Sequence, residues 1–297
     1  MSINIQYEEK GIIYFTNQKD LFKLLLVTAT KIEKDILHGK LKPLPGCDSL
    51  IKIYDGKQSY YLGLFGQYRA VHVACGEMGS IGRESSIITT TDAIAFCSPA
   101  VVLMPGIAFG IDKKKQKIGD VLVSERIISY EPQRIGESNT EFRGKESPAS
   151  SLLINRFRNT DWNYKIGDIE TKIFIGDVLS GEKLMDNTQA KNVLVKQYPG
   201  SKGGEMEGVG IASACDGKVA HWIVVKAICD FADGQKKYGK AKKQATAANS
   251  AINLCEYIFN SNHAFSEILE PYDEQIGSAK LTAKLFEITK RQIEDAN

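Results

Sequence analysis

Histidine is scarce in this sequence, since only His38, His72, His221 and His263 occur among its 297 residues. A histidine-centred triad or metal site therefore has little material. The six cysteines are widely spaced, with no CxxC pair and no Cys/His cluster of zinc-site spacing. We expect free, mostly buried thiols, and acid–base chemistry that depends on carboxylates.

Long apolar runs and a strong net charge are also absent. No stretch reaches the roughly 20 apolar residues that a membrane helix needs, and the first residues lack the layout of a secretory signal. The net charge is only +2, from 38 basic and 36 acidic residues, so bulk charge does not attract nucleic acid or a membrane. These absences predict a cytoplasmic protein with neither partner, in which any anion-binding site is local.

Apolar β-rich runs alternate with segments of helical periodicity, which is the layout of an α/β domain with a parallel or mixed sheet. The expected strands are 22–28, 51–54, 60–65, 70–75, 100–104, 120–124, 172–175 and 222–228. The expected helices are 85–96, 190–198, 206–215 and 241–259. We interpret residues 136–147 as a polar surface loop. No linker divides the chain, which predicts one domain over 1–261 and a charged helical tail over 262–297, with Leu281 and Leu285 available for docking.

Two strand-to-helix junctions are candidate ligand sites, because such turns lie at the binding edge of open α/β sheets. Glu33 falls on the first turn of a helix that follows the strand LLLVT, where the ordinary role of a glutamate is to complement the helix dipole in solvent. The second junction contains Gly76, Gly79 and Gly82, which allow backbone amides to approach an anion or a sugar hydroxyl, although a tight turn explains them equally well.

Another glycine-containing segment, residues 176–183, is similar to a phosphate-binding P-loop. Glu182 intrudes before Lys183, and no Ser or Thr follows the lysine, so both charge and the missing magnesium ligand exclude a P-loop ATPase.

The most specific pattern joins Gly204-Glu-Met-Glu-Gly208 to a strand that ends in Cys229-Asp230-Phe-Ala-Asp233. Helix-dipole complements and a helix cap would explain these acidic residues individually. Together, the order of segments resembles the nucleoside phosphorylase superfamily, and within it the methylthioadenosine/S-adenosylhomocysteine nucleosidases, over roughly residues 24–260. EMEG at 205–208 and KAICDFAD at 226–233 are similar to the family motifs EMEA/G and RAISDxAD, and PGIAFGIDKKKQKIGDVLVS at 105–124 and SGEKLM at 180–185 support them.

This resemblance implies a three-layer α/β/α sandwich around a mixed sheet, no metal or organic cofactor, and a homo-oligomer in which a neighbour closes part of the site. It implies hydrolysis of the N-glycosidic bond of a purine, most often adenine, nucleoside or nucleotide, with release of free base and ribose or ribose phosphate. Asp230 would protonate N7 of the leaving purine, and Glu33 would activate water. The chemistry is sound, because a purine anion leaves poorly without a proton and carboxylates stabilise an oxocarbenium-like sugar.

The binding roles follow from the same resemblance. Glu207 would bind the ribose hydroxyls, with Met206 beneath the sugar and Lys226 in place of the motif arginine. Leu184 and Met185 would contact the base. Lysine keeps the positive charge of arginine but does not form a bidentate fork.

Three further departures bear on the reaction. Met104 and Ile107 stand where phosphate-dependent members have an arginine and a serine, which favours water over phosphate as the nucleophile. Cys229 replaces the motif serine beside the aspartate. A phosphate-dependent phosphorylase and a catalytically inactive purine-nucleotide sensor therefore remain as alternatives.

A lysine-rich loop follows the aspartate and bears on the substrate. With Arg83, it would bind a 5′-phosphate through charge-assisted contacts, as in a nucleotide N-glycosidase of the kind that depletes adenine nucleotides in bacterial antiviral defence. A solvated helix start is the equally weighted alternative. The candidate lysines are Lys236, Lys237 and Lys240, with Lys242 and Lys243 beside them.

Overall fold

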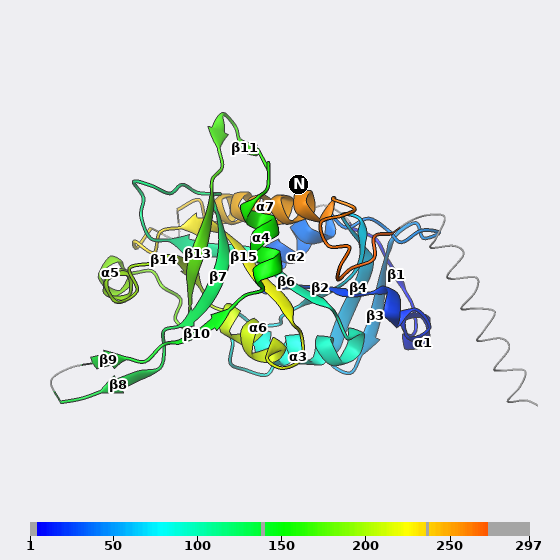
Figure 1. Cartoon of the computed structure of the whole chain (residues 1–297), viewed down its shortest axis with the longest axis horizontal. Helices are drawn as coiled ribbons and strands as arrows, with labels where there is room; N and C mark the ends of the chain where they lie inside the picture. Colours follow the sequence, from blue (N-terminus) through cyan, green and yellow to red (C-terminus); the bar gives the residue numbers. More distant parts are fainter. Residues whose placement is uncertain (1–4, 138–139, 236–237, 273–297) are drawn as a thin grey trace, which may run out of the picture.

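One mixed sheet of eleven strands forms the centre of the computed structural model, which describes residues 5–137, 140–235 and 238–272 (Figure 1). The strand order is β1-β3-β4-β5-β2-β6-β14-β13-β7-β10, and β15 pairs with both β6 and β7. The pairs β6–β14–β13–β7–β15–β6 therefore close into a small barrel at one end of the sheet. The strands are β1 (Tyr7–Glu9), β2 (Leu24–Thr28), β3 (Leu50–Asp55), β4 (Gln58–Phe65), β5 (Tyr68–Ala74), β6 (Val101–Gly110), β7 (Val121–Ser129), β10 (Lys145–Pro148), β13 (Ile173–Ser180), β14 (Ser201–Glu205) and β15 (His221–Asp230).

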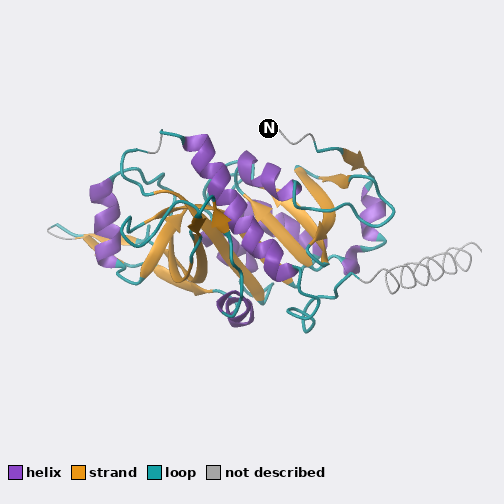
Figure 2. Ribbon diagram, turned by 90° about the horizontal axis from the view of Figure 1, so that it is seen from above, coloured by secondary structure: helices purple, strands orange, loops and turns teal. Residues whose placement is uncertain are grey.

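Helices cover both faces of this sheet, with α3 and α6 on one side and α2 and α7 on the other (Figure 1). Seen from above, helices lie over strands along the length of the molecule (Figure 2). Because β2, β6 and β15 are buried on both faces, their sequences are continuous apolar runs. The helices are α1 (Ile12–Thr16), α2 (Lys31–His38), α3 (Ser86–Cys97), α4 (Ser151–Arg158), α5 (Thr188–Gln197), α6 (Gly208–Cys215) and α7 (Lys240–Phe259).

The predicted α/β/α architecture is confirmed, and each expected strand and helix is present with bounds shifted by a few residues or extended. The expected loop at 136–147 is partly wrong, because β9 (Thr140–Phe142) pairs with β8 (Gln133–Ile135) and β10 pairs with β7. These edge strands are exposed and polar, so they have no apolar alternation to predict them. A second hairpin joins β11 (Lys165–Ile166) to β12 (Ile169–Glu170).

The predicted tail begins at residue 262, and only its first part, to residue 272, is described. That part forms turns, in which Phe265 and Leu269 are buried in the main hydrophobic core. Leu281 and Leu285 lie outside the described residues, so the domain boundary at 261 stays a prediction. Within the described ranges, every helix is too short or too polar to cross a membrane.

Candidate active site

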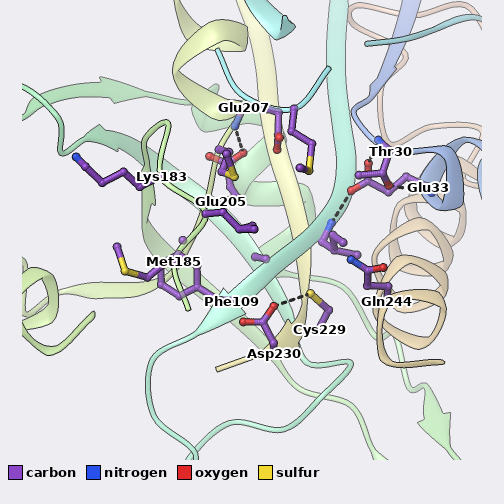
Figure 3. A pocket seen from close by; sticks show the side chains of 16 residues that line it. Thr30, Glu33, Phe109, Lys183, Met185, Glu205, Glu207, Cys229, Asp230 and Gln244 are labelled. Atoms are coloured by element: carbon purple, nitrogen blue, oxygen red, sulfur yellow. Dashed lines mark hydrogen bonds between the residues drawn. The ribbon is translucent and has the colours of Figure 1, made fainter. Parts of the chain in front are cut away.

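A pocket of about 540 Å³ opens beside the barrel, where the last residues of β6, β14 and β15 meet. Glu33, Glu207 and Asp230 enter it from α2, from the start of α6 and from the end of β15 (Figure 3). The structure thus brings the three predicted carboxylates into one pocket. The lining residues are Thr30, Glu33, Met78, Ile107, Ala108, Phe109, Lys183, Leu184, Met185, Gly204, Glu205, Met206, Glu207, Cys229, Asp230 and Gln244.

Glu33 is buried, with 1% of its surface exposed, so it is not a solvated dipole complement. Its Oε2 accepts hydrogen bonds from the N–H groups of Ala29 (2.9 Å) and Thr30 (2.7 Å), and its Oε1 accepts one from Ile107 (2.9 Å). Thr30 and Glu33 also form the capping box of α2. Three charge-assisted bonds from backbone therefore fix this carboxylate at the pocket wall.

Gly106 allows Glu33 to approach β6. A Cβ atom on this glycine would lie 2.3 Å from Glu33 Oε1 and 2.9 Å from Lys226 Nζ. Gly106 thus lies between the carboxylate of Glu33 and the buried ammonium of Lys226. Only a residue without a side chain fits there.

Lys226 is fully buried, and its Nζ lies 3.3 Å from Glu207 Oε2 and 3.8 Å from Glu205 Oε2. Burial disfavours its charge, but the carboxylates of Glu207, Glu33 and Glu205 outweigh this and raise the pKa of Lys226. The positive charge of the motif arginine is therefore retained at this position.

The two glutamates of the EMEG motif have different environments. Glu205 ends β14, and its carboxylate accepts the N–H groups of Glu207 (2.9 Å) and Gly208 (2.9 and 3.0 Å), which orders the start of α6. Burial raises the pKa of Glu205 to about 7, against the opposing effect of Lys226. Glu207 is the N-cap residue of α6 and faces both the pocket and Lys226.

The glycine turn packs against the carboxylates of Glu207 and Glu182. The N–H of Gly79 donates to Glu207 Oε1 (3.2 Å), and the N–H of Ser80 donates to Glu182 (3.0 Å). Gly79 has φ +98°, and a Cβ there would lie 2.5 Å from Glu182 Oε2. The amides that would attract an anion are thus occupied by two carboxylates of the chain itself.

Asp230 is 7% exposed and lies at the end of β15. Its Oδ1 accepts a hydrogen bond from the N–H of Ala232 (2.9 Å), and the thiol of Cys229 donates to its Oδ2 (3.3 Å) (Figure 3). The carboxyl group therefore has a fixed direction toward the pocket. An apolar wall of Phe109, Leu184 and Met185 lies beside it, which suits a purine ring.

The residues predicted to bind phosphate, as far as the structure describes them, are not among the residues that line the pocket. Arg83 is exposed and is not among the lining residues; its carbonyl accepts a hydrogen bond from Lys57. Lys240 is exposed at the first position of α7, one turn before Gln244, which lines the pocket. Lys236 and Lys237 lie outside the described residues.

Sequence reasoning missed Phe109 and Gln244 as lining residues. The apolar pattern continues past residue 104, so a longer strand would have predicted Phe109. Gln244 gave no signal, because helical periodicity does not tell which polar residue of α7 meets a cavity.

The fold is thus a mixed α/β sheet closed into a small barrel, with a buried carboxylate cluster in a pocket beside it. Residues 39–259 match the family model described as the Phosphorylase superfamily, and the chain belongs to this superfamily. The family predicted from the motifs is confirmed.

Among relatives, the chain is 31% identical over 238 residues to a death domain-containing ATP nucleosidase of Amphimedon queenslandica. The match covers 72% of this chain but only 44% of that protein, so the chain spans less than half of this relative. It is 25% identical over 187 residues to the 5′-methylthioadenosine/S-adenosylhomocysteine nucleosidase of Staphylococcus haemolyticus, covering 59% of this chain and 76% of that one.

Solved structures support the fold. The 5′-methylthioadenosine/S-adenosylhomocysteine nucleosidase of Neisseria meningitidis, in complex with methylthio-immucillin-A, superposes with a TM-score of 0.65 at 18% identity, covering 80% of this chain and 99% of that one. The Streptococcus pneumoniae enzyme with a transition-state inhibitor gives a TM-score of 0.67 at 13% identity, with the same coverage. At these identities the likeness concerns the fold.

Proposed function

We propose that this chain hydrolyses the N-glycosidic bond of a purine nucleoside or nucleotide and releases the free base, with adenine as the preferred base. The observation that supports this most is the convergence of Glu33, Glu207 and Asp230 on one pocket beside an apolar wall. The relatives named as ATP nucleosidase and methylthioadenosine/S-adenosylhomocysteine nucleosidase support the same class of reaction.

Each carboxylate has a separate task in this proposal. As the C1′–N9 bond breaks, its electron pair stays with the purine, and the proton of Asp230 goes to N7. Water adds to C1′ and gives its proton to Glu33, while Glu207 holds the ribose hydroxyls above Met206. Lys226 orients Glu207, because its ammonium lies 3.3 Å from that carboxylate.

Water, rather than inorganic phosphate, is the nucleophile that this pocket favours. The three backbone N–H groups at Ala29, Thr30 and Ile107 already bind the carboxylate of Glu33, and Met104 supplies no charge because it is buried and apolar. A phosphate ion beside Glu33 would meet its carboxylate, and the nearby ammonium of Lys226 is already paired with Glu207 and Glu205.

A 5′-phosphorylated substrate is supported by the position of α7. This 20-residue helix begins at Lys240 with no acidic residue in its first turn, and Gln244 of its second turn lines the pocket. The positive end of the helix dipole and Lys240 favour a phosphate at the pocket mouth. We propose a nucleotide N-glycosidase on this basis, of the kind that would deplete adenine nucleotides in antiviral defence.

Assembly and compartment complete the proposal. Met78, Ile81 and Leu184 are apolar and exposed on the loops that border the pocket, and we propose a homo-oligomer in which a second copy covers them. All six cysteines are free thiols, which fits a reducing compartment, and we place the enzyme in the cytoplasm.

The first test is chromatographic detection of free base after incubation with adenine and guanine nucleosides, monophosphates and triphosphates in phosphate-free buffer. Release of adenine supports a hydrolase, and faster release from nucleotides than from adenosine supports the role of Lys240. Release only after phosphate is added would replace the hydrolase by a phosphorylase. Tight nucleotide binding by calorimetry with no base released would leave the sensor alternative.

A further inference from the structure

The turn that follows the candidate acid is strained. Ala232 is completely buried and has φ +49°, a left-handed conformation that L-residues other than glycine and asparagine rarely adopt. Such a conformation persists only where surrounding contacts enforce it. The turn at residues 230–232 is therefore stabilised by contacts from other parts of the chain.

A lysine from a different element contacts this turn. Lys191 of α5 is only 6% exposed, and its Nζ donates a 2.6 Å hydrogen bond to the carbonyl oxygen of Phe231. Burial of a lysine is costly unless its ammonium has partners. The position of this side chain thus indicates a specific role in the turn.

The bonded carbonyl belongs to the same peptide unit that contacts the acid. The Phe231–Ala232 peptide accepts from Lys191 through its C=O and donates through its N–H to Asp230 Oδ1 at 2.9 Å. A cation on the carbonyl polarises the peptide and strengthens its N–H as a donor. Lys191 and Asp230 are therefore linked through one peptide bond.

We infer that Lys191 is a positioning residue for Asp230, acting through the Phe231–Ala232 peptide to fix the direction of the carboxyl group. This inference rests on the proposed function for its kinetic readout.

Other charged groups surround this lysine. Burial lowers the pKa of Lys191; Asp233 raises it, Lys113 lowers it through repulsion, and Asp230 raises it. Lys113 forms an ion pair with Asp233 and lies over the ring of Phe231. Replacement of Lys191 by a neutral residue removes one positive charge from the surroundings of Asp230, and loss of a nearby cation disfavours the ionised form of a carboxyl group.

The test compares Lys191→Met with Lys196→Met, an exposed lysine of the same helix, by the pH dependence of base release. We expect Lys191→Met to lower kcat roughly 10- to 100-fold through misplacement of the acid, to shift the basic limb of the profile upward by about one pH unit, and to leave KM nearly unchanged. Lys191→Arg, which keeps charge and donor, should retain the limb of the natural enzyme. A Lys191→Met profile that matches Lys196→Met would overturn the inference.

A second variant separates the effect of Lys191 on the geometry of the turn from the effect of its charge. Glycine accepts φ +49° without strain, so Ala232→Gly in the Lys191→Met background should recover kcat but not the position of the basic limb. Recovery of both, or of neither, would contradict the peptide link.

Base release by the natural protein shows whether a negative result concerns this inference or the proposed function. If it releases no base from any substrate, the proposed function fails, and the thermal unfolding temperature then tests the lysine alone. We expect Lys191→Met to lower that temperature relative to Lys196→Met, and Ala232→Gly to restore part of the loss. Equal temperatures in all variants would contradict the role of Lys191 in the turn.

Discussion

The carboxylates that line the pocket have similar chemistry but occupy different environments. Glu33 receives three backbone N–H groups, Glu205 is desolvated with a pKa of about 7, and Asp230 receives one N–H and one thiol. Acid and base roles in enzymes are assigned in this way, by the surroundings rather than by residue type. Single substitutions at these residues should therefore have different effects.

Asp230→Asn should keep ligand binding and lose most turnover, because the amide has the shape of the acid without its proton. General acid catalysis contributes about 10²- to 10⁴-fold, so we expect a loss of kcat in that range. Base release and calorimetry measure the two properties separately. Asp216→Asn, at an exposed site after α6, is the matched control. Turnover of Asp230→Asn close to that of the control would remove Asp230 from the acid role.

Gly106→Ala should slow hydrolysis strongly. The added Cβ would lie 2.3 Å from Glu33 Oε1, so the carboxylate must leave its three backbone donors. We expect a fall in kcat of roughly 10²-fold or more, since small displacements of a reacting group have effects of this size. Gly11→Ala is the control, because no atom lies within 4 Å of its Cβ position. Unchanged kcat in Gly106→Ala would show that the observed position of Glu33 is not needed.

At the level of elements, the sequence predicted the apolar strands well and the polar ones poorly. β2 and β15 contain unbroken apolar runs, residues 24–27 and 222–225, so their burial is visible in composition, whereas β14 has the sequence SKGGE and β10 is exposed. Burial on both faces produces a signal that an edge strand or a glycine-rich strand does not have.

The candidate site shows the same division. Glu33, Glu207 and Asp230 lie at ends of predicted elements, where a chain position alone suggests a ligand edge. Gln244 and Lys191 lie within helices, and their contacts depend on how α7 and α5 pack, which a single sequence does not reveal. The strained φ of Ala232 likewise has no signature in residue type.

Helix α2, which carries Glu33, is anchored by a buried chain of hydrogen bonds. Tyr7 Oη bonds His38 Nδ1 (2.7 Å), His38 Nε2 bonds His72 Nδ1 (2.8 Å), and His72 Nε2 bonds Thr28 Oγ1 (2.9 Å). Burial lowers the pKa of His38 to about 3 and that of His72 well below its usual value. Both rings are therefore neutral in the folded protein.

These hydrogen-bonded histidines predict that the stability of the fold decreases in acid. A histidine whose pKa is lowered by folding contributes stability above its unfolded pKa, about 6.5, and loses it as the pH falls from there toward 3. The free energy of unfolding should thus fall by about 1.4 kcal/mol per pH unit for each histidine. Denaturant titrations from pH 4 to 8 measure this slope. His38→Gln should flatten it, while His263→Gln, at an exposed site, should not. A slope unchanged by His38→Gln would contradict the assignment.

At the scale of the whole molecule, apolar side chains are exposed on two loops that contribute residues to the pocket. Ile81 is 77% exposed and Leu184 56% exposed, on the glycine turn and on the loop that contributes to the apolar wall. A substrate bound there would leave part of its surface in water, whereas enzymes that stabilise an oxocarbenium-like sugar benefit from excluding it. A second copy of the chain on this face would bury the exposed apolar side chains and exclude water from the substrate.

Ile81→Glu should therefore weaken assembly and activity together. A buried charge at an interface without a partner opposes association, so we expect a lower mass in analytical ultracentrifugation and a KM raised by about tenfold, equivalent to about 1.4 kcal/mol of lost binding. Ile13→Glu places the same charge on α1, at an exposed residue far from the pocket residues in the fold, and should change neither property. Base release measured over a range of protein concentrations adds an independent check, because an oligomeric site loses specific activity on dilution and a monomeric site does not. Full activity of a monomer at every concentration would show that the pocket is complete within one chain.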